Sequence, residues 1–138
     1  MSSVHVLGFH HFTHLVRDLD KAVAFYEGVL NLKRKARPDF GNRGVWYVMG
    51  AAGDQELHLI ETTGVPDCHE GHPAFEVTDI RGAVEACRAA GARIQQDVFV
   101  RTHDNSLSAF VRDPDDNLIE FCSHSDAARE EAGRLRHL

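Results

Sequence analysis

The stretch Gly8-Phe9-His10-His11-Phe12-Thr13-His14-Leu15-Val16-Arg17-Asp18-Leu19 decides the fold, because its pattern returns sixty-one positions later. The stretch His72-Pro73-Ala74-Phe75-Glu76-Val77-Thr78-Asp79-Ile80 places a histidine, a valine and an aspartate at the same spacings. An internal repeat with room for only two copies predicts a duplicated module rather than a solenoid. Each copy opens with a histidine, His11 in the first and His72 in the second.

The two copies predict the same order of secondary structure. In each, an apolar, β-branched run predicts a strand, and Asp18 or Asp79 then suits the N-cap of a helix with helical apolar spacing. Asn31 and Gly91 suit the left-handed position after each helix. The expected strands are 9–16, 32–36, 45–49 and 56–61, then 73–77, 93–98, 107–111 and 118–122. We therefore expect an α+β fold of two tandem βαβββ modules, 9–61 and 71–122, in a single domain over 1–123 with a charged helical tail over 124–138.

Composition excludes several classes of protein. The 138 residues are 43% hydrophobic and 26% charged, which is typical of a soluble globular domain. The net charge is −6 and no basic block is present, so neither nucleic acid nor a membrane is an expected partner. The apolar runs are strand-sized, and the start lacks the features of a signal peptide. Cys68, Cys87 and Cys122 have no paired spacing and read as reduced thiols, the last two in the core. We expect a cytoplasmic protein.

The last strand of each module carries a second polar residue. Leu57-His58-Leu59 aligns with Ile119-Glu120-Phe121 at a shift of sixty-two, and a polar residue between two apolar ones faces the opposite side of a strand. A twofold relation between the modules would bring four donors together: His11, His58, His72 and Glu120. Three imidazoles and a carboxylate predict one divalent transition metal, Zn, Ni, Fe(II) or Mn, rather than calcium.

Glu56 competes with His58 for this place. It lies two residues earlier in the strand and therefore on the same face. Aligning Glu56 with Glu120 loses the apolar match of the flanking residues, so we prefer His58.

On these residues the chain resembles the vicinal oxygen chelate superfamily, which includes glyoxalase I, extradiol dioxygenases, fosfomycin-resistance enzymes, methylmalonyl-CoA epimerase and bleomycin-binding proteins. The resemblance covers residues 9–123 and rests on three motifs: His11-x-x-x-x-Val16-x-Asp18-Leu19, Gly71-His72 and Asp113-Pro114-Asp115-x-Asn117-x-Ile119-Glu120. It implies a U-shaped mixed sheet around a metal whose ligands match His11, His72 and Glu120, with the position of His58 often the fourth. It also implies a homodimer, and leaves open whether each site lies within one chain or is shared between two.

The sequence departs from the family pattern at two places. Asp116 replaces the usual glycine of the turn before the last strand, a place that a tolerant turn residue can fill. Leu15 stands where glutathione-dependent lyases of the family tend to carry an arginine. The second departure weakens the case for a glutathione conjugate as substrate.

The expected function is a metal-dependent, glyoxalase-like lyase or isomerase acting on a small molecule that chelates the metal through adjacent oxygens. Glu120 would serve as ligand or as a base, with His58 assisting, and no further cofactor-binding residue is predicted. If only His11, His72 and Glu120 bind, the set is a facial triad, and an extradiol-type Fe(II) ring-cleaving dioxygenase follows. A drug-binding resistance protein is the second alternative, which the intact ligand set disfavours. Five aromatic residues are candidates for the cavity wall: Phe40, Trp46, Tyr47, Phe99 and Phe110.

Overall fold

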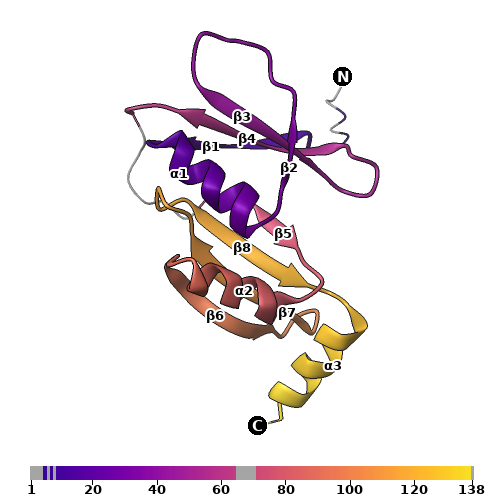
Figure 1. The fold of residues 1–138 in the computed structure, drawn as a ribbon. Coiled ribbons are helices and arrows are strands. Elements are labelled where there is room, and N and C mark those ends of the chain that lie inside the picture. Colours follow the sequence, from indigo (N-terminus) through magenta and orange to yellow (C-terminus); the bar gives the residue numbers. More distant parts are fainter. Residues whose placement is uncertain (1–4, 6, 8, 65–70, 138) are drawn as a thin grey trace.

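The computed structural model describes residues 5, 7, 9–64 and 71–137, which form two βαβββ modules and a C-terminal helix (Figure 1). Module one contains β1 (His11–Val16), α1 (Leu19–Val23), the π-helical η1 (Ala24–Val29), β2 (Lys33–Lys35), β3 (Gly44–Met49) and β4 (Gln55–Glu61). Module two contains β5 (Ala74–Glu76), α2 (Ile80–Ala89), β6 (Ile94–Arg101), β7 (Ser106–Arg112) and β8 (Leu118–Ser123), and α3 (Asp126–Leu135) follows. The predicted α+β fold of tandem βαβββ modules is confirmed.

Each module forms its own four-stranded mixed sheet. The strand orders are β1-β4-β3-β2 and β5-β8-β7-β6, so the first strand of each module lies beside the last. That pair is parallel in both sheets, and the other neighbours are antiparallel. The identical topology establishes that the sequence repeat is a repeat of structure.

The helices begin and end where the sequence predicts. Asp18 Oδ1 accepts a hydrogen bond from Lys21 N at 3.1 Å, and Asp79 Oδ1 accepts one from Gly82 N at 3.0 Å. Each aspartate thus binds a backbone N–H that the first turn leaves unpaired. Asn31 (φ 57°) and Gly91 (φ 82°) adopt the left-handed conformation beyond the helix ends. Asp116 does the same in its turn, with φ 65°.

The helix of module one differs from a regular α-helix in its second half. Leu30 N donates to Phe25 O and Leu32 N donates to Tyr26 O, both at 3.0 Å, which are wider turns than the i→i+4 pattern. The sequence predicted one continuous α-helix here, because apolar spacing over so few residues does not distinguish the two.

The core lies between each sheet and its own helix. Leu57 and Leu59 of β4, and Ile119 and Phe121 of β8, are at most 2% exposed and belong to one apolar cluster with α1, η1 and α2. Because strand side chains alternate, the neighbouring polar residues point to the other face of each sheet. We call that helix-free face the site face of the module.

The two modules of one chain meet through the helical side of module one. Three hydrogen bonds of 2.8–3.0 Å join them: Tyr26 Oη to Asp113 Oδ2, Arg17 N to Asp115 Oδ1, and Asn117 Nδ2 to Leu15 O. In Figure 1, α1 lies between the two sheets. The two site faces of one chain are therefore not opposed.

The C-terminal helix α3 is docked rather than solvated. Its N-cap is Ser125, and Ala128 and Ala132 are buried in the apolar cluster. Asn105 Nδ2 donates to Arg129 O at 3.0 Å, which ties α3 to the turn after β6. In the ranges described, no helix is both long and apolar enough to cross a membrane.

Candidate metal centre

The strand ladders identify the equivalent positions of the two modules. Thr13 of β1 pairs with His58 of β4, and Ala74 of β5 pairs with Glu120 of β8. Thr13 and Ala74 each lie two residues after the histidine that opens the module. His58 and Glu120 therefore occupy matching positions, as the sixty-two-residue shift predicted.

Module one presents two imidazoles on its site face. The rings of His11 and His58 are stacked with centroids 4.0 Å apart and planes 12° apart. Trp46, which pairs with His58 across β3 and β4, stacks on the same ring at 4.5 Å and 13°. His58 is consequently held between two rings, with 8% of its surface exposed.

Glu56 also lies on this face, where it is hydrogen-bonded to His58. Its Oε1 is 2.9 Å from His58 Nε2, and its Oε2 accepts a hydrogen bond from Lys35 Nζ at 2.5 Å. The hydrogen bonds from His58 and then from Lys35 lower the pKa of Glu56 to about 2. An ionised carboxylate only accepts hydrogen bonds, so His58 Nε2 carries the proton and Nδ1 keeps its lone pair. This is the arrangement of a metal-binding histidine oriented by a carboxylate.

The surroundings also keep His58 neutral. Burial lowers the pKa of its imidazole, and the neighbouring His11 lowers it further, against the opposing effect of Glu56. A neutral imidazole is the form that binds a metal.

Module two presents one imidazole and one carboxylate. His72 Nε2 is 3.1 Å from Glu120 Oε1. The other oxygen, Oε2, accepts hydrogen bonds from Arg101 Nη1 at 2.9 Å and Ser108 Oγ at 3.0 Å. Phe110 meets the His72 ring edge-on at 5.1 Å. Glu120 is only 7% exposed, and these donors compensate its buried charge.

One chain does not bring the two pairs together. Within the described ranges, Glu76, Cys122 and His124 form a group of side chains whose possible ligand atoms lie close to one another. None of the four predicted ligands belongs to this group. The sequence left open whether the four meet within one chain or between two chains, and within this chain they do not form one group. The physical reason is that α1 and η1 stand between the sheets. The residues remain a predicted ligand set, in two halves.

The group of Glu76, Cys122 and His124 also lies on the site face of module two. His124 Nδ1 is 2.7 Å from Glu76 Oε2, and Cys122 Sγ donates to the same oxygen at 3.2 Å. Burial, and then Glu76, raise the pKa of the Cys122 thiol to about 12, so it stays protonated. Cys122 was expected in the core and is instead half-buried on this face, whereas Cys87 is buried as expected. Cys68 lies outside the described residues.

We call the pair His11 and His58 one half-site and the pair His72 and Glu120 the other. Several residues that surround these half-sites were not predicted from the sequence. Lys35 carried no signal beyond a run of basic residues. Arg101 lies beyond the strand expected over 93–98, because shifts of register in β6 obscure the strand pattern. His10, whose Nδ1 is 2.9 Å from His11 Nδ1, was not singled out either. Tyr47 is wrong as a cavity-wall residue, because it is fully buried on the opposite face to Trp46.

The two half-sites suit a divalent transition metal. Each provides two donors, and each has a donor hydrogen-bonded to an outer partner, as metal ligands in proteins are. Together they give three nitrogens and one carboxylate oxygen, a set suited to zinc, nickel, iron(II) or manganese. His11, His58, His72 and Glu120 are the residues that could hold such an ion.

Comparison with known sequences gives a consistent result. Residues 8–121 match the family model described as Glyoxalase/Bleomycin resistance protein/Dioxygenase superfamily. A lactoylglutathione lyase of Haemophilus influenzae is 32% identical over 120 residues, covering 77% of this chain and 84% of that protein. A lactoylglutathione lyase of Neisseria meningitidis is 30% identical over 114 residues, covering 77% and 83%.

Solved structures show the same fold. The fosfomycin resistance protein FosX of Listeria monocytogenes, complexed with Mn(II) and 1S,2S-dihydroxypropylphosphonic acid, aligns with a TM-score of 0.73 at 18% identity, covering 92% of this chain and 99% of that one. Lactoylglutathione lyase of Agrobacterium tumefaciens aligns with a TM-score of 0.66 at 20% identity, covering 87% and 96%.

Proposed function

Because the chain belongs to the Glyoxalase/Bleomycin resistance protein/Dioxygenase superfamily, we propose that it is a glyoxalase-like, metal-dependent lyase or isomerase. Its substrate is a small molecule that offers two adjacent oxygens to the metal. The observation that carries the proposal is the pair of repeat-equivalent donors, His58 and Glu120, each oriented by neighbours on its own site face. The relatives named lactoylglutathione lyase support the enzyme class.

The active assembly in this proposal is a homodimer. Module one of one chain would face module two of its partner, which joins the imidazole pair to the His72–Glu120 pair. A twofold exchange of this kind is self-complementary and produces two identical sites. It also leaves the contact between Tyr26 and Asp113 within each chain intact.

The protonation state of each residue determines its proposed role in the reaction. A bound divalent ion would stabilise negative charge that develops on a substrate oxygen. Glu120, with one oxygen held by Arg101 and Ser108, would use Oε1 either as a metal ligand or, released from the metal, as the base that accepts a proton from substrate carbon and returns it to a neighbouring atom. Glu56 and Lys35 would keep His58 neutral and fixed in direction.

The substrate in this proposal is free of glutathione. Leu15 lies on the site face of β1, paired with Ile60, where an arginine is expected in glutathione-dependent lyases. The ligand of the FosX structure carries two adjacent hydroxyl groups and no peptide, which supports the wider class of chelating substrates. Turnover of the methylglyoxal–glutathione adduct at least as fast as that of glutathione-free substrates would contradict this part of the proposal.

A mixture of two defective chains tests the shared site. His58→Ala damages module one, and Glu120→Ala damages module two. If sites form between chains, unfolding and refolding the two variants together in equal amounts restores about a quarter of the wild-type sites, because half the dimers are mixed and each has one intact site. Metal content and activity measure the recovery, and each variant alone is the control. Metal and activity that stay at the level of the single variants would rule out the shared site.

A further inference from the structure

The site face of module one continues beyond the imidazole pair as a row of rings. Trp46 stacks on His58, and Phe40 lies 6.0 Å from Trp46 at an angle of 42°. Phe40 is 59% exposed, which makes it one of the few large apolar side chains that the described surface displays. Exposed aromatic rings next to metal-binding side chains are typical of a surface that binds a planar molecule.

Arg37 lies at the end of this row. Its Cζ is 4.9 Å from the centroid of the Phe40 ring, and its Nη1 and Nη2 donate to Asn42 O at 3.1 Å and Asn42 Oδ1 at 2.6 Å. Both acceptors are neutral. In the parts of the chain that the structure describes, no carboxylate lies within the 4.0 Å of an ion pair from Arg37.

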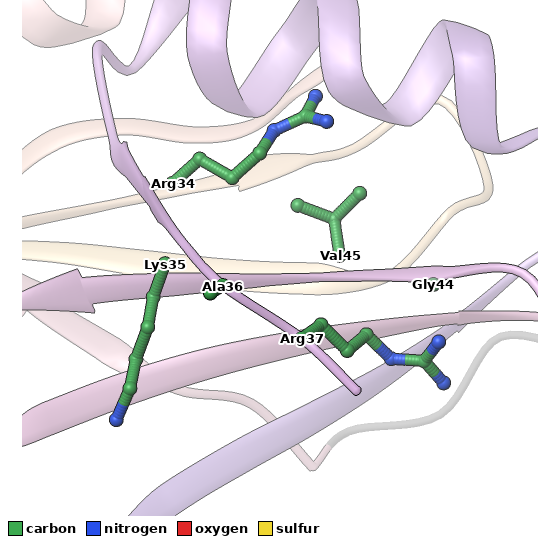
Figure 2. A pocket seen from close by; sticks show the side chains of 6 residues that line it. All are labelled: Arg34, Lys35, Ala36, Arg37, Gly44 and Val45. Carbon is green, nitrogen blue, oxygen red and sulfur yellow. The ribbon is translucent and has the colours of Figure 1, made fainter. Parts of the chain in front are cut away.

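The neighbouring cations, unlike Arg37, each form an ion pair with a carboxylate. Arg34 Nη2 is 2.6 Å from Glu27 Oε1, and Lys35 Nζ is bound by Glu56. Figure 2 shows Arg34 and Lys35 on opposite sides of the strand, with Arg37 extending along Gly44. These side chains line a groove of about 390 Å³ beside β2. Arg37 is thus the cation of this groove whose charge no described carboxylate balances.

The contact between Arg37 and Gly44 places Arg37 on the site face. Lys35, the last residue of β2, pairs with Trp46 and bonds to Glu56 on that face, and Gly44, two residues before Trp46 in β3, faces the same side. A Cβ added to Gly44 would lie 2.8 Å from Arg37 Cζ, which shows that the guanidinium rests against Gly44. Gly44 is two residues from Trp46 along β3, a separation of about 7 Å. A ring packed against Trp46 and Phe40 would therefore have Arg37 within reach of one edge.

We infer that the substrate is a planar ring compound with an anionic group at the edge away from its chelating oxygens. The ring packs on Trp46 and Phe40, and the carboxylate or phosphonate-like group binds Arg37 by charge-assisted hydrogen bonds. This inference rests on the proposed function, because it extends the same metal-binding site.

The single tryptophan of the chain provides a direct measurement. Trp46 fluorescence is titrated in the zinc-loaded, full-length protein with 3,4-dihydroxybenzoate, with 3,4-dihydroxyphenylphosphonate and with the neutral 3,4-dihydroxybenzamide. We expect at least one of the two anions to bind about tenfold or more tightly than the amide. Comparison of the two anions shows which group Arg37 accepts. Zinc content is measured in every sample.

Two arginine variants form the matched pair. Arg37→Gln should abolish the preference for the anion, whereas Arg34→Gln, on the opposite side of the strand, should preserve it. Arg37→Lys, which retains the charge, should keep part of the preference and guards against a general loss of folding in Arg37→Gln.

The outcomes separate this inference from the proposed function. Equal binding of acids and amide by the zinc-loaded protein, or an unchanged preference in folded Arg37→Gln, would overturn the inference and leave the metalloenzyme standing. Tighter binding of S-methylglutathione than of either ring acid would overturn it as well. Failure of the wild-type protein to bind zinc, nickel, iron(II) or manganese would overturn the proposed function, and the inference with it.

Discussion

At the position opposite Thr13, module one carries the imidazole of His58, whereas module two carries the carboxylate of Glu120 at the position opposite Ala74. The parallel pairing of the first strand with the last, the strand order and the burial of the flanking residues are the same in both modules. The side chains that surround His58 and Glu120 differ between the modules. The topology therefore fixes where a donor lies, and the sequence of each copy decides what that donor needs around it.

The neighbours complement the charge of each donor. His58, a neutral ligand, is bound by the carboxylate of Glu56, which lowers the cost of bringing a cation close. Glu120, a charged ligand, is bound by a guanidinium and a hydroxyl. Each half-site thus holds one carboxylate paired with one cation, and joining the half-sites across two chains would bring both pairs to one ion.

The largest expected effect is on module two. His72→Ala should lose most of the bound metal, because the remaining donors do not complete the coordination shell. The measurement is metal content after purification without chelator. Glu76→Gln, on the same site face but outside the predicted ligand set, is the control and should keep its metal. Near-stoichiometric metal in His72→Ala would remove His72 from the site.

The second prediction compares His58 and Glu56, the two candidate metal ligands of β4. His58→Ala should lose most of the metal, whereas Glu56→Gln should weaken metal affinity about tenfold to a hundredfold, as loss of an orienting partner does. Competition with a chromogenic chelator measures both. The reverse order would make Glu56 the ligand. Full metal in His58→Ala, with catechol-dependent oxygen uptake by the Fe(II) form, would favour the dioxygenase.

The third expected effect concerns the contact between the modules. Tyr26→Phe removes a buried hydrogen bond to Asp113, and we expect it to lower the free energy of unfolding by about 1 kcal/mol. Asp113→Asn tests the same contact from its other side. Urea denaturation of both variants and of the double variant gives the coupling energy, and the double variant should lose less than the sum. Simple additivity would show that the two side chains do not interact.

The smallest expected effect is the pH dependence of one surface pair. The hydrogen bond that His124 donates to Glu76 raises the pKa of His124, so the stabilisation from His124 is fully present below about pH 6.5 and is lost as pH rises through the raised value. Burial tends to raise the pKa of Glu76, but the hydrogen bonds from His124 lower it overall. The stabilisation from Glu76 is therefore lost as pH falls through the lowered pKa. The pair therefore stabilises most between these limits.

Both side chains are largely exposed, so the effect should not exceed about 0.5 kcal/mol. Urea midpoints at pH 5.5 and 8.5 should differ more in the wild-type protein than in His124→Gln. An identical difference in the two proteins would assign the pH dependence to other groups.

The sequence predicted what depends on local pattern. The duplicated βαβββ order, the N-caps Asp18 and Asp79, and the shared facing of His58 and Glu120 follow from spacing alone, and all three are present. Two errors were avoidable by the same rule. Trp46 and Tyr47 are adjacent in a strand, so only one of them faces the site, and Cys122 lies two residues from Glu120 and so shares its face.

The arrangement of the modules could not be read in this way. A repeat shows which residues are equivalent, but it does not show whether the two copies that face each other belong to one chain or to two. That depends on how η1 packs against residues 113–117, and on a hydrogen bond between residues eighty-seven positions apart. Contacts of such separation leave no periodic signal in the sequence.

The wide helical turn of η1 has a consequence for the length of module one. The N-caps of the two helices, Asp18 and Asp79, are sixty-one positions apart, whereas the left-handed residues that follow them, Asn31 and Gly91, are only sixty apart. Module one therefore carries one residue more between these points than module two. The π-helical hydrogen bonds accommodate the extra residue without breaking the helix. The extra residue lies in the helical segment that carries Tyr26, so the two modules differ in length at the place where a hydrogen bond joins them.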